Sequence, residues 1–108
     1  MIYELRTYHA VPGRLPDLVK RFETTTLKLF EKHGIRAVGF WTTYIGASTN
    51  DFYYMLEWTD LAERQARWDA FSIDPEWVKA RAESEAEGPL HTGITNQFLT
   101  PTSFSKLK

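Results

Sequence analysis

The 108-residue sequence contains no cysteine, which excludes disulfide bonds, a thiolate nucleophile and cysteine-based zinc sites. It also lacks an excess of either charge, because 13 Lys and Arg residues stand against 14 Asp and Glu residues. Without a block of basic residues, we expect no nucleic-acid partner. Long apolar runs are absent too, and the first residues lack the cationic start and apolar core of a signal peptide. A cytoplasmic protein without a membrane span is therefore expected.

The motifs of several enzyme classes are missing as well. The six glycines are scattered, so the sequence has neither a dinucleotide-binding fingerprint nor a phosphate-binding loop. The nucleophile elbow of many hydrolases, G-x-S-x-G, does not occur. The histidines His9, His33 and His91 show no metal-ligand spacing, and His33 has a structural place at the end of a predicted helix. We therefore expect no metal and no cofactor.

Aromatic side chains, in contrast, are abundant. They make up 15% of the chain, as four Trp, five Tyr and seven Phe, within a hydrophobic share of 43%. A chain of this length forms one domain, which we place at residues 1–108, with an ordered core to about residue 100 and a tail after it, over 101–108. So many rings in so small a core indicate either a lined pocket or a buried interface.

Hydrophobic patterning predicts four strands and three helical pieces. The strands are expected at residues 2–9, 35–44, 52–58 and 92–99. One helix begins near Leu15 and ends at Gly34, and two shorter ones begin after Asp60 and Asp74, the second running to Gly88. The order β-α-β-β-α-β predicts an α+β protein of the ferredoxin-like class, with a four-stranded antiparallel sheet and helices on one face.

Charged residues on the predicted helices are expected to face solvent. On the first helix they lie opposite the apolar stripe, at Lys20, Arg21, Glu23, Lys28, Glu31 and Lys32. Glu83, Glu85 and Glu87 crowd the end of the last helix, where the helix dipole disfavours negative charge. These three residues indicate either a solvated, frayed helix end or a docking patch for a basic partner.

Both faces of the predicted sheet need cover. Phe52, Tyr54 and Leu56 are apolar on one parity of their strand, while Tyr53 and Met55 are apolar on the other. Helices on one face cover only one of these sets. A second copy of the chain, packed sheet against sheet, would cover the other set, and a twofold homodimer is the simplest such assembly.

Charged residues on the first strand form one candidate site. Glu4, Arg6 and Tyr8 share a parity there, and Tyr53 and Glu57 share the matching parity of the neighbouring strand. Because an unpaired buried charge is very costly, we expect Glu4, Arg6 and Glu57 to pair with one another or across the dimer seam. The set is interpreted either as a satisfied ion-pair network or as an acid–base or anion-binding site.

Aromatic residues of the opposite parity form a second candidate site. Tyr3 and His9 are expected to face the helices together with Trp41 and Trp58, and to meet Trp68 there. Rings at these spacings usually form core, but the polar tips of Tyr3, His9 and the indoles also suit a small aromatic or acyl ligand. In such a pocket His9 is the candidate base.

Several short motifs follow one another along nearly the whole chain. They are Tyr3-Glu4-Leu5-Arg6-x-Tyr8 with Pro12-Gly13, Gly39-Phe40-Trp41, Gly46, Trp58-x-Asp60-Leu61-Ala62-Glu63-Arg64, Asp74-Pro75-Glu76-Trp77 and Pro101-x-Ser103-Phe104. In this order and spacing they resemble the NIPSNAP family. The resemblance implies a ferredoxin-like fold assembled as a dimeric α+β barrel.

The resemblance implies less about chemistry. The family has no agreed catalytic residues, and the wider superfamily includes cofactor-free monooxygenases, haem-degrading enzymes, isomerases and simple binding proteins. Residues 91–97 depart from relatives that often carry Ser and Arg in this stretch, which argues against a site built on the polar side chains of that strand. Haem degradation is disfavoured because no histidine stands out as an axial ligand.

Two functions are compatible with these observations. The leading hypothesis is a dimeric small-molecule-binding protein, whose enzymatic form is a cofactor-independent monooxygenase or isomerase acting on an aromatic or apolar substrate. In that enzyme His9 or Glu4 would take a proton, and Arg6 or an indole would hold the developing anion. The ligand-binding residues would be Tyr3, Tyr8, Trp41, Tyr53, Glu57, Trp58 and Trp68. The alternative is a structural or protein-interaction module without catalysis.

Overall fold

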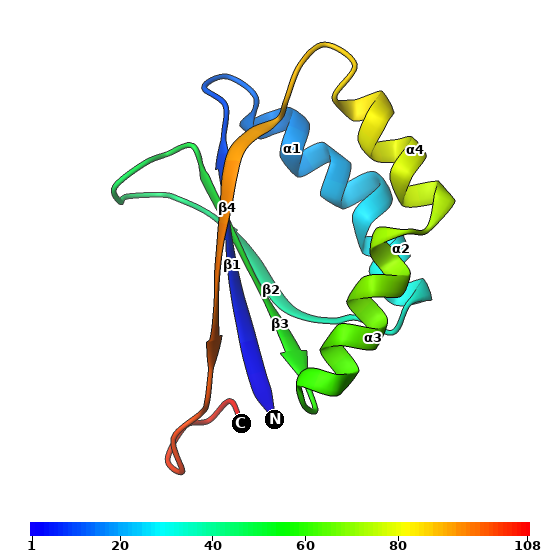
Figure 1. Ribbon diagram of the computed structural model, residues 1–108. Coiled ribbons are helices and arrows are strands. Elements are labelled where there is room, and N and C mark those ends of the chain that lie inside the picture. Colours follow the sequence, from blue (N-terminus) through cyan, green and yellow to red (C-terminus); the bar gives the residue numbers. More distant parts are fainter.

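The computed structural model describes residues 1–108 as a four-stranded antiparallel sheet with all of the helices on one of its faces (Figure 1). The strands, in the spatial order β2-β3-β1-β4, are β1 (Ile2–Ala10), β2 (Arg36–Thr42), β3 (Asp51–Trp58) and β4 (His91–Leu99). This arrangement confirms the expected ferredoxin-like α+β fold. Because β1 is hydrogen-bonded along both edges, the positions of its side chains are fixed from both sides.

The first helix is one continuous rod with an irregular middle. α1 (Leu15–Arg21) passes into a π-helical segment, η1 (Phe22–Thr26), and then into α2 (Leu27–Lys32). The rod ends at Gly34 as expected, where φ is +68° and the Arg67 guanidinium lies too close to leave room for a side chain. The apolar stripe predicts the helix but not its π-helical turn, which holds one extra residue.

The next two helices, α3 (Leu61–Ser72) and α4 (Pro75–Ser84), begin where their caps predict. The carboxylates of Asp60 and Asp74 each accept a hydrogen bond from a backbone N–H of the first turn, at 2.8 and 2.9 Å. α4 ends before the expected Gly88, because the helix dipole disfavours the acidic stretch that follows it. None of the helices combines the length and the apolar character that a membrane crossing needs.

The two faces of β1 are arranged the opposite way from the sequence-based expectation. Glu4, Arg6 and Tyr8 are buried on the helix-covered face, whereas Tyr3 and His9 belong to the open face. The prediction that Tyr3 and His9 face the helices was therefore wrong. Alternation along a strand separates two sets of side chains but does not say which set is covered. The charged set is buried because residues of the neighbouring elements pair with its charges.

The hydrophobic core fills the space between the sheet and the helices. Tyr54 and Trp58 of β3 are fully buried. The rings of Phe22 and Phe30 lie 5.0 and 6.1 Å from the ring of Tyr54, and that of Phe40 stacks on it at 5.6 Å. Much of the high aromatic content of the sequence therefore packs in the core.

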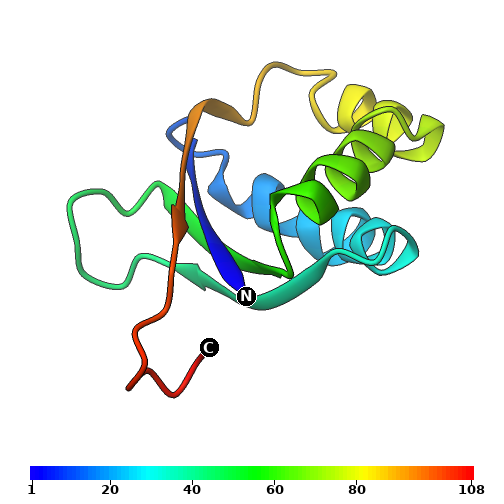
Figure 2. The same cartoon turned by 60° about the horizontal axis from the view of Figure 1, so that its bottom comes forward.

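The open face of the sheet is partly apolar. Cross-strand pairing places Leu5 beside Met55 and Tyr53 beside Trp41. Trp41 is 50% exposed, and its indole lies across Gly39, where an added side chain would collide with the ring. The loop between β2 and β3 projects from this side of the sheet, away from the helices (Figure 1 and Figure 2).

Candidate functional site

Glu4 lies at the centre of a closed polar network on the helix-covered face of β1. Its fully buried carboxylate accepts hydrogen bonds from Arg6 at 3.0 Å, Trp58 at 3.1 Å, Asn96 at 2.9 Å and Arg64 at 3.2 and 3.3 Å. We call these five residues the Glu4 network. Its members come from β1, β3, α3 and β4, so the network ties four elements to one carboxylate.

The surroundings keep Glu4 ionised. Burial alone would raise the pKa of its carboxyl, but hydrogen bonds from Asn96 and Arg64 and the charge of Arg6 outweigh that effect, so the pKa is lowered. A carboxylate offers about four acceptor directions, and these donors fill them. Glu4 therefore has no free acceptor position that could take a proton from a substrate. Of the two interpretations of this set, the structure fits the satisfied ion-pair network. The bond from Asn96 shows that the strand at 91–97 does contribute polar side chains.

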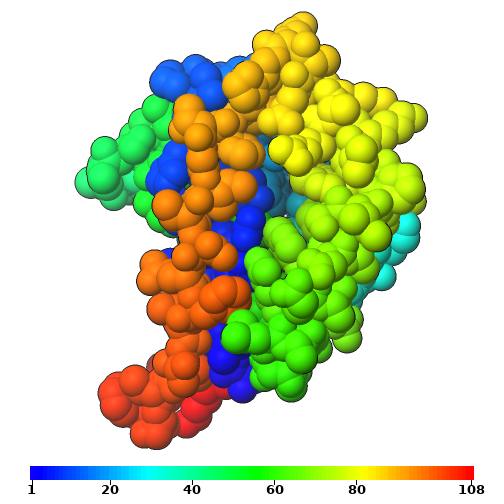
Figure 3. Space-filling view, viewed as in Figure 1, coloured from blue at the N-terminus to red at the C-terminus, as the bar shows by residue number.

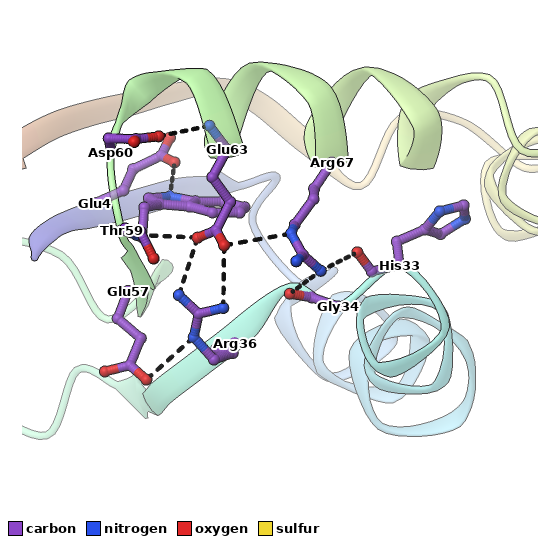
Figure 4. A network of polar contacts seen from close by, with 10 residues as sticks. Glu4, His33, Gly34, Arg36, Glu57, Thr59, Asp60, Glu63 and Arg67 are labelled. Atoms are coloured by element: carbon purple, nitrogen blue, oxygen red, sulfur yellow. Dashed lines mark hydrogen bonds and ion pairs between the residues drawn. The ribbon is translucent and has the colours of Figure 1, made fainter.

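Glu57 does not join the Glu4 network. It lies on the open face of β3 and pairs with Arg36 at 3.4 Å, and Arg36 also binds Glu63 of α3 at 2.9 Å (Figure 4). The expected pair of Glu4 and Arg6 is confirmed, whereas the expected pairing of Glu57 with either of them within the chain was wrong. The register explains this, because the side chains of Glu57 and of Glu4 leave the sheet on opposite faces.

A cavity of about 190 Å³ lies further along the same face of β1 as the Glu4 network. Figure 3 shows the surface hollowed between β4, in orange, and α4, in yellow, with blue atoms of the first strand at the bottom. Five aromatic rings line the cavity, those of Tyr8, Phe30, Trp68, Phe71 and Trp77. Apolar walls with a few polar groups between them are typical of small-molecule sites.

The polar lining of the cavity contains no acidic residue. It consists of Arg6, Arg21, Thr26, Ser72, Arg81 and His91. Two of these cations have carboxylate partners, since Arg6 binds Glu4 at 3.0 Å and Arg81 binds Glu85 at 3.4 Å. The third cation, Arg21, has no such carboxylate partner. We call this cavity the Arg21 cavity.

Arg21 is a buried cation without a carboxylate partner. Arg21 is 5% exposed, and its Nη1 donates a hydrogen bond to Oγ of Ser84 at 3.3 Å. The Nε–H of Arg21 and the Nδ1 of His91 are the two buried side-chain nitrogen or oxygen atoms in the protein that have no partner. Both of these residues line the cavity, so the unmet hydrogen-bonding capacity of the core is concentrated there.

Burial sets the charge of these two groups. It lowers the pKa of Arg21, but a guanidinium stays protonated at neutral pH. Burial and the nearby charge of Arg21 lower the pKa of His91, so its imidazole is neutral at pH 7. The cavity therefore offers one positive charge without an ion-pair partner beside a neutral imidazole.

The sequence-based prediction that Arg21 faces solvent was wrong. Arg21 follows the core residue Leu18 by three positions, which places it at the edge of the apolar stripe and not opposite it. It is also the residue directly before η1, and Thr26 at the end of η1 lines the same cavity. The Thr26 hydroxyl donates to the backbone carbonyl of Arg21 at 3.4 Å. Such π-helical turns are frequent at functional sites.

His9, the expected base, is not part of the Arg21 cavity. Its Nδ1 is 2.8 Å from Oδ1 of Asp51, and its Nε2 is 3.5 Å from Oγ1 of Thr95, on the open face of the sheet. These contacts fix the ring at the end of β1. The pocket role predicted for His9 on the helix-covered face therefore does not fit its position.

The other predicted ligand-binding residues divide between the two faces. Tyr8 and Trp68 line the Arg21 cavity, and Trp58 belongs to the Glu4 network. Tyr3, Trp41, Tyr53 and Glu57 lie on the open face. The sequence-based list thus mixes residues that the sheet separates.

Ten of the twelve residues that line the cavity are absent from that list, among them Arg21, Trp77, Arg81 and His91. Trp77 had a visible signal, because it follows the helix start at Asp74 and Pro75 within a motif. Arg81 and His91 had none, since the packing of α4 against α1 and η1 and the pairing of β4 with β1 bring them to the cavity.

Comparison with known proteins agrees with this description. The NIPSNAP family model matches residues 3–106. A NIPSNAP family protein of unknown function, Atu4242 from Agrobacterium tumefaciens, is 26% identical, with a TM-score of 0.88 over 100% of this chain and 94% of that chain. A NIPSNAP-like domain protein from Burkholderia xenovorans is 27% identical, with a TM-score of 0.85 over 96% of this chain and 87% of that chain. None of the curated proteins matches the chain.

More distant structures share the fold alone. A putative antibiotic biosynthesis monooxygenase from Nitrosomonas europaea is 5% identical, with a TM-score of 0.65 over 94% of this chain and 98% of that chain. Because the family model covers nearly the whole length, and the order of strands and helices is the expected one, this chain belongs to the NIPSNAP family.

Proposed function

We propose that the protein is a small-molecule-binding protein that holds an aromatic ligand in the Arg21 cavity and acts as a cytoplasmic homodimer. The observation that carries the proposal is the combination of five aromatic walls with two unpartnered buried nitrogens, on Arg21 and His91. A buried donor without a partner destabilises a protein by about 1–3 kcal/mol. Such atoms in the walls of an apolar cavity support a ligand that forms hydrogen bonds with them.

The dimer in this proposal rests on the open face of the sheet. Trp41 is half exposed there, and Tyr44 and Ile45 in the loop that projects from this side are 93% and 89% exposed (Figure 2). Apolar side chains gathered on one face are typical of protein interfaces. A twofold partner would place its own sheet on this face, and the projecting loop would reach around it. Sedimentation equilibrium at micromolar concentration tests this part, and a monomer there contradicts it.

An enzymatic form of the proposal, a cofactor-independent monooxygenase or isomerase, needs a base and an anion-stabilising group beside the substrate. In the Arg21 cavity these groups are His91, whose imidazole is neutral, and Arg21. His91 takes the place that the sequence suggests for His9 or Glu4, and Arg21 takes that of Arg6 or an indole. The neutral form of His91 supports its use as the base.

A thermal-shift screen of single-ring aromatic compounds tests the binding function. A ligand at 100 times its Kd stabilises the protein by about 2.7 kcal/mol, which raises the Tm by roughly 10 °C or more for a domain of this size. The variant Trp41→Phe, changed on the open face, is the control and should show the same shift. If no compound moves the Tm, the alternative of a structural or protein-interaction module is favoured.

A further inference from the structure

No carboxylate of the protein forms an ion pair with Arg21. The two other arginines of the cavity are paired with Glu4 and Glu85, and no Asp or Glu belongs to the lining. Taking an unpaired charge out of water carries a penalty of several kcal/mol, so buried cations are normally matched by an anion. Arg21 is therefore suited to an anion that comes from outside the chain.

The free edge of the Arg21 guanidinium has a defined shape. Nη1 donates to Ser84, and the Nε–H of the opposite edge is buried without a partner. Two parallel N–H groups on one guanidinium edge match the two oxygens of a carboxylate. The unpartnered Nδ1 of His91 adds a further hydrogen-bonding position in the same cavity.

The apolar part of the cavity limits the size of the rest of the ligand. An engineered protein cavity of about 150 Å³ lined by apolar side chains binds benzene. The Arg21 cavity has about 190 Å³, which accommodates one six-membered ring and a small polar group. Its walls include Trp68, Phe71 and Trp77, and the guanidinium of Arg21 lies 5.1 Å from the centre of the Trp77 ring.

We propose that the Arg21 cavity is selective for single-ring aromatic carboxylates of the size of benzoate. The carboxylate binds the Nε and Nη2 edge of Arg21, with His91 beside it, and the ring lies among Trp68, Phe71 and Trp77. This assignment rests on the proposed binding function and adds the charge and the size of the ligand.

Isothermal titration calorimetry with benzoate and with benzamide tests the assignment. The two molecules have nearly the same shape and differ in charge. Benzoate should bind the full chain, and benzamide should bind at least about 10-fold more weakly, because hydrogen bonds to a charged group contribute about 1.5–3 kcal/mol, or about 10- to 150-fold in affinity. Arg21→Met, which keeps an apolar stem without charge, should weaken benzoate binding by a similar factor.

Lys20→Met is the matched control. Lys20 is the exposed neighbour of Arg21 and lines a groove between α1 and α4 that Arg21 also borders, but it does not line the Arg21 cavity. It should leave the affinity for benzoate within about twofold. Weaker binding in Lys20→Met, by a factor like that in Arg21→Met, would place the anion in that groove and overturn the assignment.

The remaining outcomes separate this inference from the proposed function. Equal binding of benzoate and benzamide overturns the anion selectivity but leaves the Arg21 cavity as a small-molecule site. Unchanged benzoate binding in Arg21→Met overturns the role of Arg21, and circular dichroism of that variant establishes that it is folded. Failure of both compounds, together with a thermal-shift screen in which no aromatic compound raises the Tm, overturns the proposed function as well.

Discussion

The Glu4 network and the Arg21 cavity lie on the same buried face of the sheet, yet their arginines differ in whether a carboxylate pairs with them. In the network, Arg6 and Arg64 both bind one carboxylate, which also accepts hydrogen bonds from Trp58 and Asn96. In the cavity, Arg21 has no carboxylate and leaves its Nε–H without a partner. The first region is complete within the chain, whereas the second leaves donors for a group from outside.

Arg6 connects the two regions. Its Nη1 binds Glu4 at 3.0 Å, its Nε donates to Tyr54 at 2.7 Å, and its guanidinium lies 4.4 Å from the centre of the Trp68 ring, a wall of the cavity. The network therefore holds a cavity wall in place. The comparison teaches that a buried charged side chain does not by itself indicate a binding site. A buried side chain whose hydrogen-bonding groups have no partner within the protein is the more informative sign.

The largest expected effect comes from breaking the Glu4 network. Glu4→Gln removes the buried negative charge and leaves Arg6 and Arg64 without their counter-ion, which should lower the free energy of unfolding by about 3–5 kcal/mol. Urea denaturation measures it. Glu57→Gln makes the same chemical change in the half-exposed pair with Arg36, where the expected loss is at most about 1 kcal/mol. Equal losses of unfolding free energy in the two variants would show that the Glu4 network stabilises the fold no more than an exposed ion pair does.

The next prediction separates the open face from both buried regions. Met55→Lys places a charge at the centre of the proposed dimer interface and should weaken the dimer by about 100-fold, or 2.7 kcal/mol. Analytical ultracentrifugation measures it, with Leu27→Lys on α2 as the control that keeps the dimer. Because the Arg21 cavity lies on the helix-covered face and the proposed interface on the open face, dissociation should leave benzoate binding unchanged. Loss of both together would contradict that separation.

A smaller effect on stability, of the opposite sign to that of Glu4→Gln, is expected in the cavity. Arg21→Met removes a buried donor that has no partner, so the free energy of unfolding should stay the same or rise by up to about 2 kcal/mol, while benzoate binding is lost. Urea denaturation of the ligand-free protein is the measurement. A fall as large as that in Glu4→Gln would mean that Arg21 is a structural residue.

The smallest effect is expected at Asp74, a carboxylate that is saturated like Glu4 but lies at a helix cap. It accepts hydrogen bonds from Lys32 at 2.8 Å, His33 at 2.7 Å and the backbone of Glu76 at 2.9 Å, and these hold its pKa well below the ordinary value of 3.8. A depressed pKa stabilises the folded protein above pH 3.8, and this contribution is lost as the pH falls below that value.

Asp74→Asn keeps a capping side chain but removes the charge, so it should lower the Tm at pH 7 by roughly 5 °C or less. The difference from the wild type should shrink as the pH is lowered from 4 towards 2, because the Asp74 carboxylate takes up a proton in the unfolded chain over this range while it stays ionised in the folded protein. Thermal melts across this range measure it. A difference that is constant with pH would mean that the charge of Asp74 is not its source.

The sequence predicts the fold well because its evidence is local. The helix starts at Asp60 and Asp74 and the helix end at Gly34 depend on residues within one turn of each other, and all three are found where expected. The order of strands and helices then leaves few topologies open. The π-helical turn at Phe22–Thr26 has no such local pattern and could not be predicted.

The candidate site was predicted only in part, because it depends on which face of the sheet the helices cover. Glu4, Arg6 and Tyr8 were recognised as a set, but the set was expected on the face opposite the helices. Arg21 and His91 both line the cavity although they are 70 residues apart in the sequence (91 − 21). No spacing pattern in a sequence predicts a contact between residues so far apart. Tertiary packing alone brings them together.

The four tryptophans allow one measurement that tests the division between these regions directly. In ¹H–¹⁵N spectra during a titration with benzoate, the indole N–H signals of Trp68 and Trp77, which line the Arg21 cavity, should shift. Those of Trp58, which is bound to Glu4, and of Trp41 on the open face should stay in place. Shifts confined to Trp58 or Trp41, or no shift at any of the four at saturating benzoate, would contradict the account.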